Sequence, residues 1–258
     1  MKKATRLFLP CDPVNHRTRV CAVMLALASA GICSAAMFPY STSFSSAEGF
    51  SVGPVIGQGG WNSPNDYTNY IVKDSGTGPQ CASVGAGNGY TSWIKSPVIT
   101  NSPETGKFWV EFAYKIGTEN TLGDETIQVS SNSGNLVYLI NITPEMVLSF
   151  NNTAAAGVSI ARGQWYHYSV EVDNGVGGSL YVNGQKVADA AYGSSGQYGL
   201  GLGLLTFYGG DAAGGSWPSG DIYSYVGDVR MGAGVIPEPL SVTLLGLGLG
   251  AVMWRRRR

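Results

Sequence analysis

The chain has 258 residues, 13% of them charged, and a formal net charge of −1. Five of its sixteen basic residues lie within residues 1–36 and four are the terminal arginines, so residues 37–254 keep seven basic against sixteen acidic residues, a net charge of −9. An acidic segment of this kind is repelled by phosphate backbones, which excludes nucleic acid from the expected partners.

Residues 1–36 have the organisation of a secretory signal peptide. A basic segment from Lys2 to Arg19 precedes an apolar stretch over residues 20–32, which we expect to form a signal helix, and residues 33–36 offer small-residue cleavage sites. We expect export through the Sec translocon and cleavage by signal peptidase near Ala36. A lipoprotein attached through Cys33 is the alternative, although Ile32 is larger than the small residue usual before a lipidated cysteine.

Few residues in the rest of the chain could support metal or nucleophilic chemistry. Cys81 is the only cysteine after the signal peptide, so no disulfide can form within the mature chain, and we expect this side chain to be buried rather than bridged to another chain. His167 is the only remaining histidine, too few for a zinc site of His and Cys ligands. A Ser-His-Asp arrangement through His167 lacks a nucleophile-elbow motif. The sequence therefore predicts no metal centre and no catalytic residues.

Alternating apolar and polar residues predict one β-rich domain over residues 37–234. In residues 107–116, one face carries Phe108, Val110, Phe112, Tyr114 and Ile116, and the other carries Trp109, Glu111, Ala113 and Lys115. Further strands are predicted over residues 126–130, 136–142, 165–173, 200–208 and 222–231. The Asn183-Gly184 pair predicts a type I′ hairpin that joins residues 179–182 to residues 185–188. Many short strands with Gly and Asn turns favour a sandwich or a barrel.

Two stretches resemble the laminin-G and pentraxin-like branch of the concanavalin A-like superfamily. The first is WYHYSVEVD at residues 165–173, and the second is LYVNG at residues 180–184. In that family, a strand that carries a tryptophan leads through an Asp-containing turn into a hairpin with a Tyr/Phe-Val-Asn-Gly sequence. Residues 44–61 and 227–230 are similar to the opening and closing segments of these domains. The resemblance implies an all-β jelly-roll sandwich of two antiparallel sheets in which the first and last strands pair.

Glucanases share this fold, so an enzyme is a rival hypothesis. Their retaining mechanism places two carboxyl groups about 5 Å apart, and the family carries them in a Glu-x-Asp-x-(x)-Glu pattern on one strand. Glu171 and Asp173 supply the first half of the pattern, but residues 174–178 contain no second glutamate and read as a turn. The sequence therefore predicts a protein that is not an enzyme.

Exposed tryptophans favour glycan binding, because sugars stack their apolar faces on aromatic rings. Trp217, in the Gly-rich stretch 214–220, is the first candidate and Trp61 is the second, whereas Trp109 and Trp165 lie in predicted strands where packing is the expected role. No cofactor is expected unless calcium binds, as it often does in this family through oxygen ligands. The candidate calcium ligands flank two Gly-containing regions without a contiguous loop motif; they are Asp66, Asp74, Asp211, Asp221 and Asp228.

Residues 235–258 have the organisation of a sorting signal. Pro237-Glu238-Pro239 is rigid and extended, an apolar run from Leu240 to Trp254 follows, and the chain closes with Arg255, Arg256, Arg257 and Arg258. The run of about 15 residues spans roughly 22 Å as a helix, and snorkelling arginines can extend it across a bilayer core of about 30 Å. We therefore expect a transmembrane helix whose arginines stay on the cytoplasmic side.

This tail resembles the PEP-CTERM sorting signal of Gram-negative bacteria. The resemblance implies an exosortase-type processing enzyme as partner, a transient stay in the inner membrane, and delivery to the cell surface or extracellular matrix; a plain membrane anchor is the alternative. We expect an exported cell-envelope protein that binds polysaccharide or has a structural role in exopolysaccharide or biofilm. The alternatives are a glycan-processing enzyme of the same fold and a self-associating matrix protein without a glycan ligand.

Overall fold

The computed structural model describes residues 36–64, 69–73, 78–85, 87–88, 92–118, 124–209, 211–212 and 223–236. By its internal contacts the chain divides into two units, Met1–Cys33 and Ser34–Arg258, and every described residue belongs to the second. The predicted signal helix, the tail from Pro237 onward and Trp217 lie outside the described residues. Among the described residues, no helix has the length and hydrophobicity that crossing a membrane requires.

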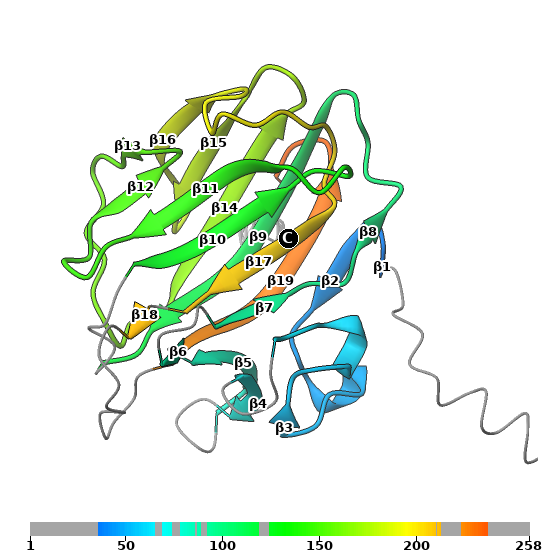
Figure 1. Ribbon diagram of the computed structural model, residues 1–258, viewed down its shortest axis with the longest axis vertical. Helices are drawn as coiled ribbons and strands as arrows, with labels where there is room; N and C mark the ends of the chain where they lie inside the picture. Colours follow the sequence, from blue (N-terminus) through cyan, green and yellow to red (C-terminus); the bar gives the residue numbers. More distant parts are fainter. Residues whose placement is uncertain are drawn as a thin grey trace, which may run out of the picture. The chain divides into compact units, whose positions relative to one another are not determined.

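A nine-stranded antiparallel sheet forms one layer of the domain (Figure 1). Its order is β16 (Gln185–Ala191), β15 (Gly177–Val182), β14 (Tyr166–Asp173), β9 (Lys107–Ile116), β19 (Tyr223–Ala233), β5 (Gln80–Gly85), β4 (Asn69–Lys73) and β3 (Gly53–Pro54). The ninth strand, β2 (Tyr40–Thr42), also pairs with β19, with Thr42 opposite Val229.

A six-stranded antiparallel sheet forms the second layer and lies in front of the first in Figure 1. Its order is β13 (Thr153–Ala154), β12 (Leu148–Phe150), β11 (Leu136–Ile142), β10 (Glu125–Ser130), β17 (Leu204–Tyr208) and β7 (Trp93–Lys95). Two short parallel pairs join β1 (Ala36–Met37) to β8 (Ile99–Thr100) and β18 (Asp211–Ala212) to β6 (Gly87–Asn88). The 3₁₀ helices η1 (Ser46–Glu48) and η2 (Gln58–Gly60) complete the described elements.

The predicted all-β sandwich of two antiparallel sheets is confirmed. Strand β9 has the predicted bounds, and Asn183 and Gly184 have φ angles of 51° and 79°, as a type I′ hairpin requires. The strand predicted from Leu200 begins only at Leu204. The chain before it runs too close to the β10–β11 turn for regular pairing, since a Cβ on Gly203 would lie 2.0 Å from the carbonyl oxygen of Ser131.

The pairing of the first and last strands is confirmed in part. Strand β2 lies against β19 as expected, but the first strand of the described chain, β1, pairs in parallel with β8 instead. The start and the end of the domain are therefore joined through β2 rather than through its first residues.

Aromatic rings hold the two sheets together. Phe112 of β9 and Phe207 of β17 face each other with their ring centroids 5.2 Å apart, and Tyr168 of β14 stacks on Phe112 at 5.5 Å. The inward face predicted for β9 is buried throughout. The core is therefore built by the period-two alternation of strands from both layers.

One hydrogen bond inside this core gives a stability prediction. Buried Tyr114 donates a 2.6 Å hydrogen bond to the buried carboxylate of Glu125, and burial together with the Glu125 charge raises the pKa of Tyr114. Tyr114→Phe is expected to lower the free energy of unfolding by about 1–3 kcal/mol, because the carboxylate loses a donor that water cannot replace. Urea denaturation measures the loss. Tyr181→Phe, on the outer face of β15, is the control, and equal stability of the two variants would contradict the prediction.

Candidate functional site

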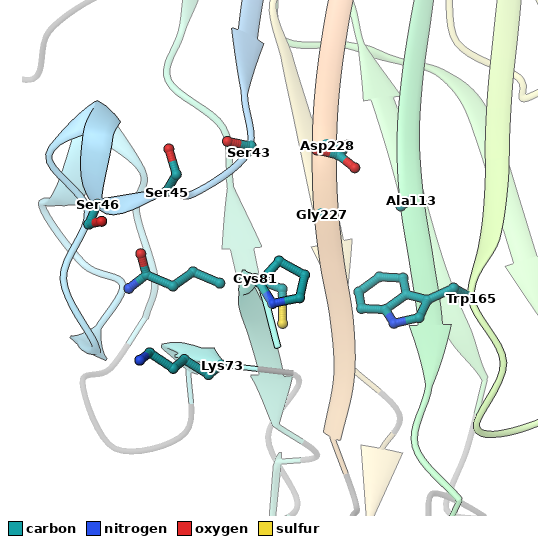
Figure 2. A pocket seen from close by; sticks show the side chains of 11 residues that line it. Ser43, Ser45, Ser46, Lys73, Cys81, Ala113, Trp165, Gly227 and Asp228 are labelled. Carbon is teal, nitrogen blue, oxygen red and sulfur yellow. The ribbon is translucent and has the colours of Figure 1, made fainter. Parts of the chain in front are cut away.

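A hollow of about 700 Å³ lies on the outer face of the nine-stranded sheet, and we call it the Trp165 hollow. Its floor is formed where Ala113 of β9 pairs with Gly227 of β19, next to Cys81 of β5 (Figure 2). Cys81 is 2% exposed, which confirms its predicted burial. Because neither Ala113 nor Gly227 has a side chain that extends beyond Cβ, the outer face of the sheet has a depression at this point.

Trp165 forms one wall of the hollow, directly before β14 begins (Figure 2). The Lys115 ammonium lies 5.3 Å from the Trp165 ring centroid and 4.3 Å from that of Tyr225, so cation–π contacts help to fix the indole. A Cβ on Gly227 would lie 3.8 Å from the edge of the indole. The partly exposed ring therefore stands directly beside the floor.

The sequence assigned Trp165 a packing role, and this interpretation was incomplete. The alternation of residues 165–173 could have indicated the partly exposed position of Trp165, because it places Trp165 on the same outward face as His167. The other expectation, for Trp61, was wrong: this side chain is 1% exposed, and its Nε1 donates a 3.0 Å hydrogen bond to the Tyr40 hydroxyl. Trp61 packs on Phe44 in the core, so its ring is closed to a glycan.

The opposite wall is the segment that leads into η1, with Ser43, Ser45 and Ser46 at the hollow (Figure 2). The carboxylate of Glu48 accepts hydrogen bonds from the backbone N–H groups of Ser43 at 2.9 Å and Ser45 at 3.2 Å, and from the hydroxyl of Thr42 at 3.0 Å. One side chain thus holds the backbone of this wall.

These contacts make the stability of the wall depend on pH. Partial burial raises the pKa of Glu48, but the hydrogen bonds from Ser43, Thr42 and Ser45 together lower it below its ordinary value of 4.5. A lowered pKa in the folded state means that the carboxylate contributes stability above pH 4.5, and that this contribution is lost as pH falls through the folded pKa. The effect is small because the group is mostly in water.

Glu48→Gln is accordingly expected to be less stable than the unchanged protein at neutral pH and to approach it at acid pH. Thermal unfolding of both proteins across this range measures the difference. A stability gap that stays constant from neutral to acid pH would argue that the carboxylate does not hold the wall.

Strand β19 contains a bulge at the edge of the Trp165 hollow. Gly227 pairs with Ala113 and Arg230 with Glu111, so β19 uses one residue more than β9 over the same distance. Asp228 takes up the extra length with a φ of 46°, a left-handed conformation that Asp adopts more readily than most residues. The bulge turns the exposed Asp228 carboxylate to the rim of the hollow.

Of the candidate calcium ligands, only Asp228 has a described side chain. In the described part of the chain, no group of three or more His, Cys, Asp or Glu side chains converges in a way that could hold a metal ion. Calcium binding therefore stays a prediction.

Two other polar residues that the sequence singled out lie on the same outer face. His167 pairs with Ala113 of the floor, and its Nε2 is shielded from solvent, with no hydrogen-bond partner among the described residues. Glu171, from the partial glucanase pattern, forms an ion pair with Lys107 at 2.9 Å. The predicted turn after Asp173 is present, closed by a 3.0 Å hydrogen bond from the Val176 N–H to the Asp173 carbonyl.

No protein-family model matches the chain, and no curated protein is similar to it in sequence. Its fold is similar to those of several solved structures. A sialidase matches with a TM-score of 0.56 and 12% identity, over 76% of this chain and only 18% of the sialidase. The alginate lyase Aly36B, solved in complex with an alginate trisaccharide, matches with a TM-score of 0.52 and 13% identity, over 76% of this chain and 99% of the lyase. The cellulose induced protein Cip1 matches at 0.51 and 14%, over 78% of this chain and 100% of Cip1.

At these identities the matches establish a shared fold. They also correct the prediction that the protein is not an enzyme. That prediction depended on the missing second glutamate of the glucanase pattern, whereas alginate lyases have the same fold. The absence of one glucanase motif therefore says nothing against other chemistry on this sheet.

Proposed function

We propose that the domain binds a glycan in the Trp165 hollow. The observation that carries the proposal is a partly exposed indole standing beside a floor of Ala113 and Gly227, within a rim of hydroxyl, amide and carboxylate groups and the Lys73 ammonium. An aromatic wall suits the apolar face of a sugar ring, and the convergent polar groups of the rim suit its hydroxyls. The hollow also has the volume of a small-molecule site. The solved Aly36B complex with an alginate trisaccharide supports a sugar ligand for this fold.

The place of action in this proposal is outside the cytoplasm. The basic and apolar segments of residues 1–36 support export, and the Pro237-Glu238-Pro239 motif with its terminal arginines supports sorting by an exosortase-type enzyme. The glycan would then be a component of the cell surface or of the surrounding exopolysaccharide.

A second candidate function is cleavage of the bound glycan. His167 favours it, because it pairs with Ala113 of the floor and stands on the same outward face of β14 as Trp165. Histidine is a common acid–base residue in catalysis. Binding and cleavage use the same hollow in this proposal, so one experiment can address both.

The test incubates the protein, purified in detergent, with cellulose, β-1,3-glucan, mannan, chitin and alginate. Retained protein and released sugars are measured in the same samples. Gly227→Leu is the variant, because its Cβ meets only ordinary contacts of 3.8 Å or more and the added side chain would fill the hollow. Ala161→Leu, at an exposed loop position, is the control. Retention that Gly227→Leu removes supports the proposal, and retention of both variants alike would place binding elsewhere.

A further inference from the structure

A second hollow of about 340 Å³ lies on the same outer face, and we call it the Asp173 hollow. Its floor again consists of small residues, since Asp173 of β14 pairs with Gly177 of β15, and Gly177 pairs with Ala191 of β16. A Cβ on Gly177 would lie 2.8 Å from the carbonyl oxygen of Ala190. Glycine is therefore what allows β16 to approach closely and the floor to stay low.

The two hollows adjoin opposite ends of one strand. Trp165 directly precedes β14, and Asp173 is its last residue. At a rise of about 3.3 Å per residue, the two positions are roughly 26 Å apart along the strand. A single sugar unit is much shorter than this, so one ligand reaches both hollows only if it is a chain.

Hydrogen-bonding side chains line the sheet between the hollows, some of them exposed and others, namely Ser169, Glu111 and Trp109, mostly buried among their neighbours. Residues that face each other across neighbouring strands stand on the same side of a sheet, and two such rows cross the nine-stranded sheet here. One row is Lys186, Tyr181, Ser169, Glu111 and Arg230, and the next is Asp189, Ser179, Glu171 and Trp109.

The charges in these rows are already paired with one another. The Lys107 ammonium lies 2.9 Å from the Glu171 carboxylate, Lys186 lies 2.7 Å from Asp189, and Arg230 lies 3.3 Å from Glu111. A polyanion would have to compete with carboxylates for every one of these cations. Hydroxyl groups, in contrast, can donate to the carboxylates and accept from the cations without breaking the pairs.

We infer that the natural occupant of this face is a neutral, hydroxyl-rich polysaccharide chain that runs along β14 and β9 and enters both hollows. The inference rests on the proposed function, because the Trp165 hollow supplies the aromatic part of the path. It adds the chemical class of the ligand, its direction on the sheet and a second subsite at the Asp173 hollow.

The variant Val176→Arg tests the second subsite. Val176 lines the Asp173 hollow and is 68% exposed, so an arginine there obstructs the hollow without entering the core. Val147→Arg is the matched control, since Val147 is 52% exposed in the β11–β12 connection, away from both hollows. The two variants differ in place and not in chemistry.

The full chain in detergent is titrated calorimetrically with trimers and octamers of β-1,4-glucan, β-1,3-glucan and mannan, and with an alginate octamer. For one of the neutral sugars, we expect the octamer to bind about tenfold or more tighter than the trimer. Val176→Arg removes this gain and leaves trimer binding unchanged, while Val147→Arg changes neither. Binding of the neutral octamer is insensitive to salt, as expected for an uncharged ligand.

Three outcomes would overturn the inference. Equal affinity for trimer and octamer, or equal effects of Val176→Arg and Val147→Arg, would remove the second subsite and leave the proposed function standing. Tighter binding of alginate, weakened by salt, would replace the neutral ligand by an anionic one. A failure of every sugar to bind would overturn the proposed function together with the inference.

Discussion

Phe207→Ala is expected to lower the free energy of unfolding by about 3–5 kcal/mol. Phe207 is fully buried and joins the two sheets, with its ring 5.2 Å from Phe112 and 6.2 Å from Tyr114. A third aromatic ring, that of Trp61, lies 6.3 Å from the Phe207 ring in a stacked arrangement. Alanine would leave a cavity walled by three rings that neighbouring strands hold in place, so little of the space can be refilled.

The loss is a large part of the total stability of a typical domain, about 5–15 kcal/mol. Guanidinium denaturation followed by tryptophan fluorescence measures it. Phe207→Leu, which keeps most of the volume, is the matched variant and is expected to lose clearly less. If the two substitutions cost the same, cavity formation is not the cause and this part of the core is more plastic than its packing suggests.

Trp165→Ala is expected to weaken glycan binding by roughly tenfold or more, as for a central aromatic contact in a recognition site. The indole forms a complete wall of the Trp165 hollow, and removing it leaves the sugar with the floor and the polar rim only. Stability should change little, because the ring lies on the outer face of the sheet. Binding to the sugars that the unchanged protein retains, followed by calorimetry, gives the affinity.

Trp93→Ala is the control, since Trp93 is also a partly exposed tryptophan under a lysine, with the Lys95 ammonium 4.1 Å from its ring centroid. It belongs to β7 of the other sheet and should leave binding unchanged. Trp165→Phe should keep part of the affinity. Should Trp93→Ala weaken binding as much as Trp165→Ala, the loss would not be specific to the hollow, and the prediction would be contradicted.

Local patterns were sufficient to predict many of the strands. The alternation of residues 107–116 predicts the bounds of β9 and its buried inward face, although Trp109, Glu111 and Lys115 of the other face are buried as well. Asn183-Gly184 acts within four residues of chain, because the positive φ angles of both residues decide the turn. Such features depend on residues that are close in sequence, so they can be predicted from the amino-acid sequence alone.

The hollow could not be predicted in the same way. Its floor needs Cys81, Ala113 and Gly227 on neighbouring strands, and the strand order of a sheet is decided by long-range packing. The bulge at Asp228 depends in turn on the register between β19 and β9. For Trp61, the local sequence was misleading. Its turn-rich neighbours suggest an exposed ring, but the fold brings Phe44 and Tyr40 against it and buries it.

The position of β19 within the nine-stranded sheet affects how the domain would respond to a mechanical load. This strand leads directly into the residues of the predicted tail, and it is hydrogen-bonded to β9 on one side and to β5 and β2 on the other. A pull along the axis of β19 would load many of these hydrogen bonds together instead of opening them one after another. A domain held by its tail at a surface, with a polysaccharide chain drawn across its outer face, would carry the tension through its best-paired strand.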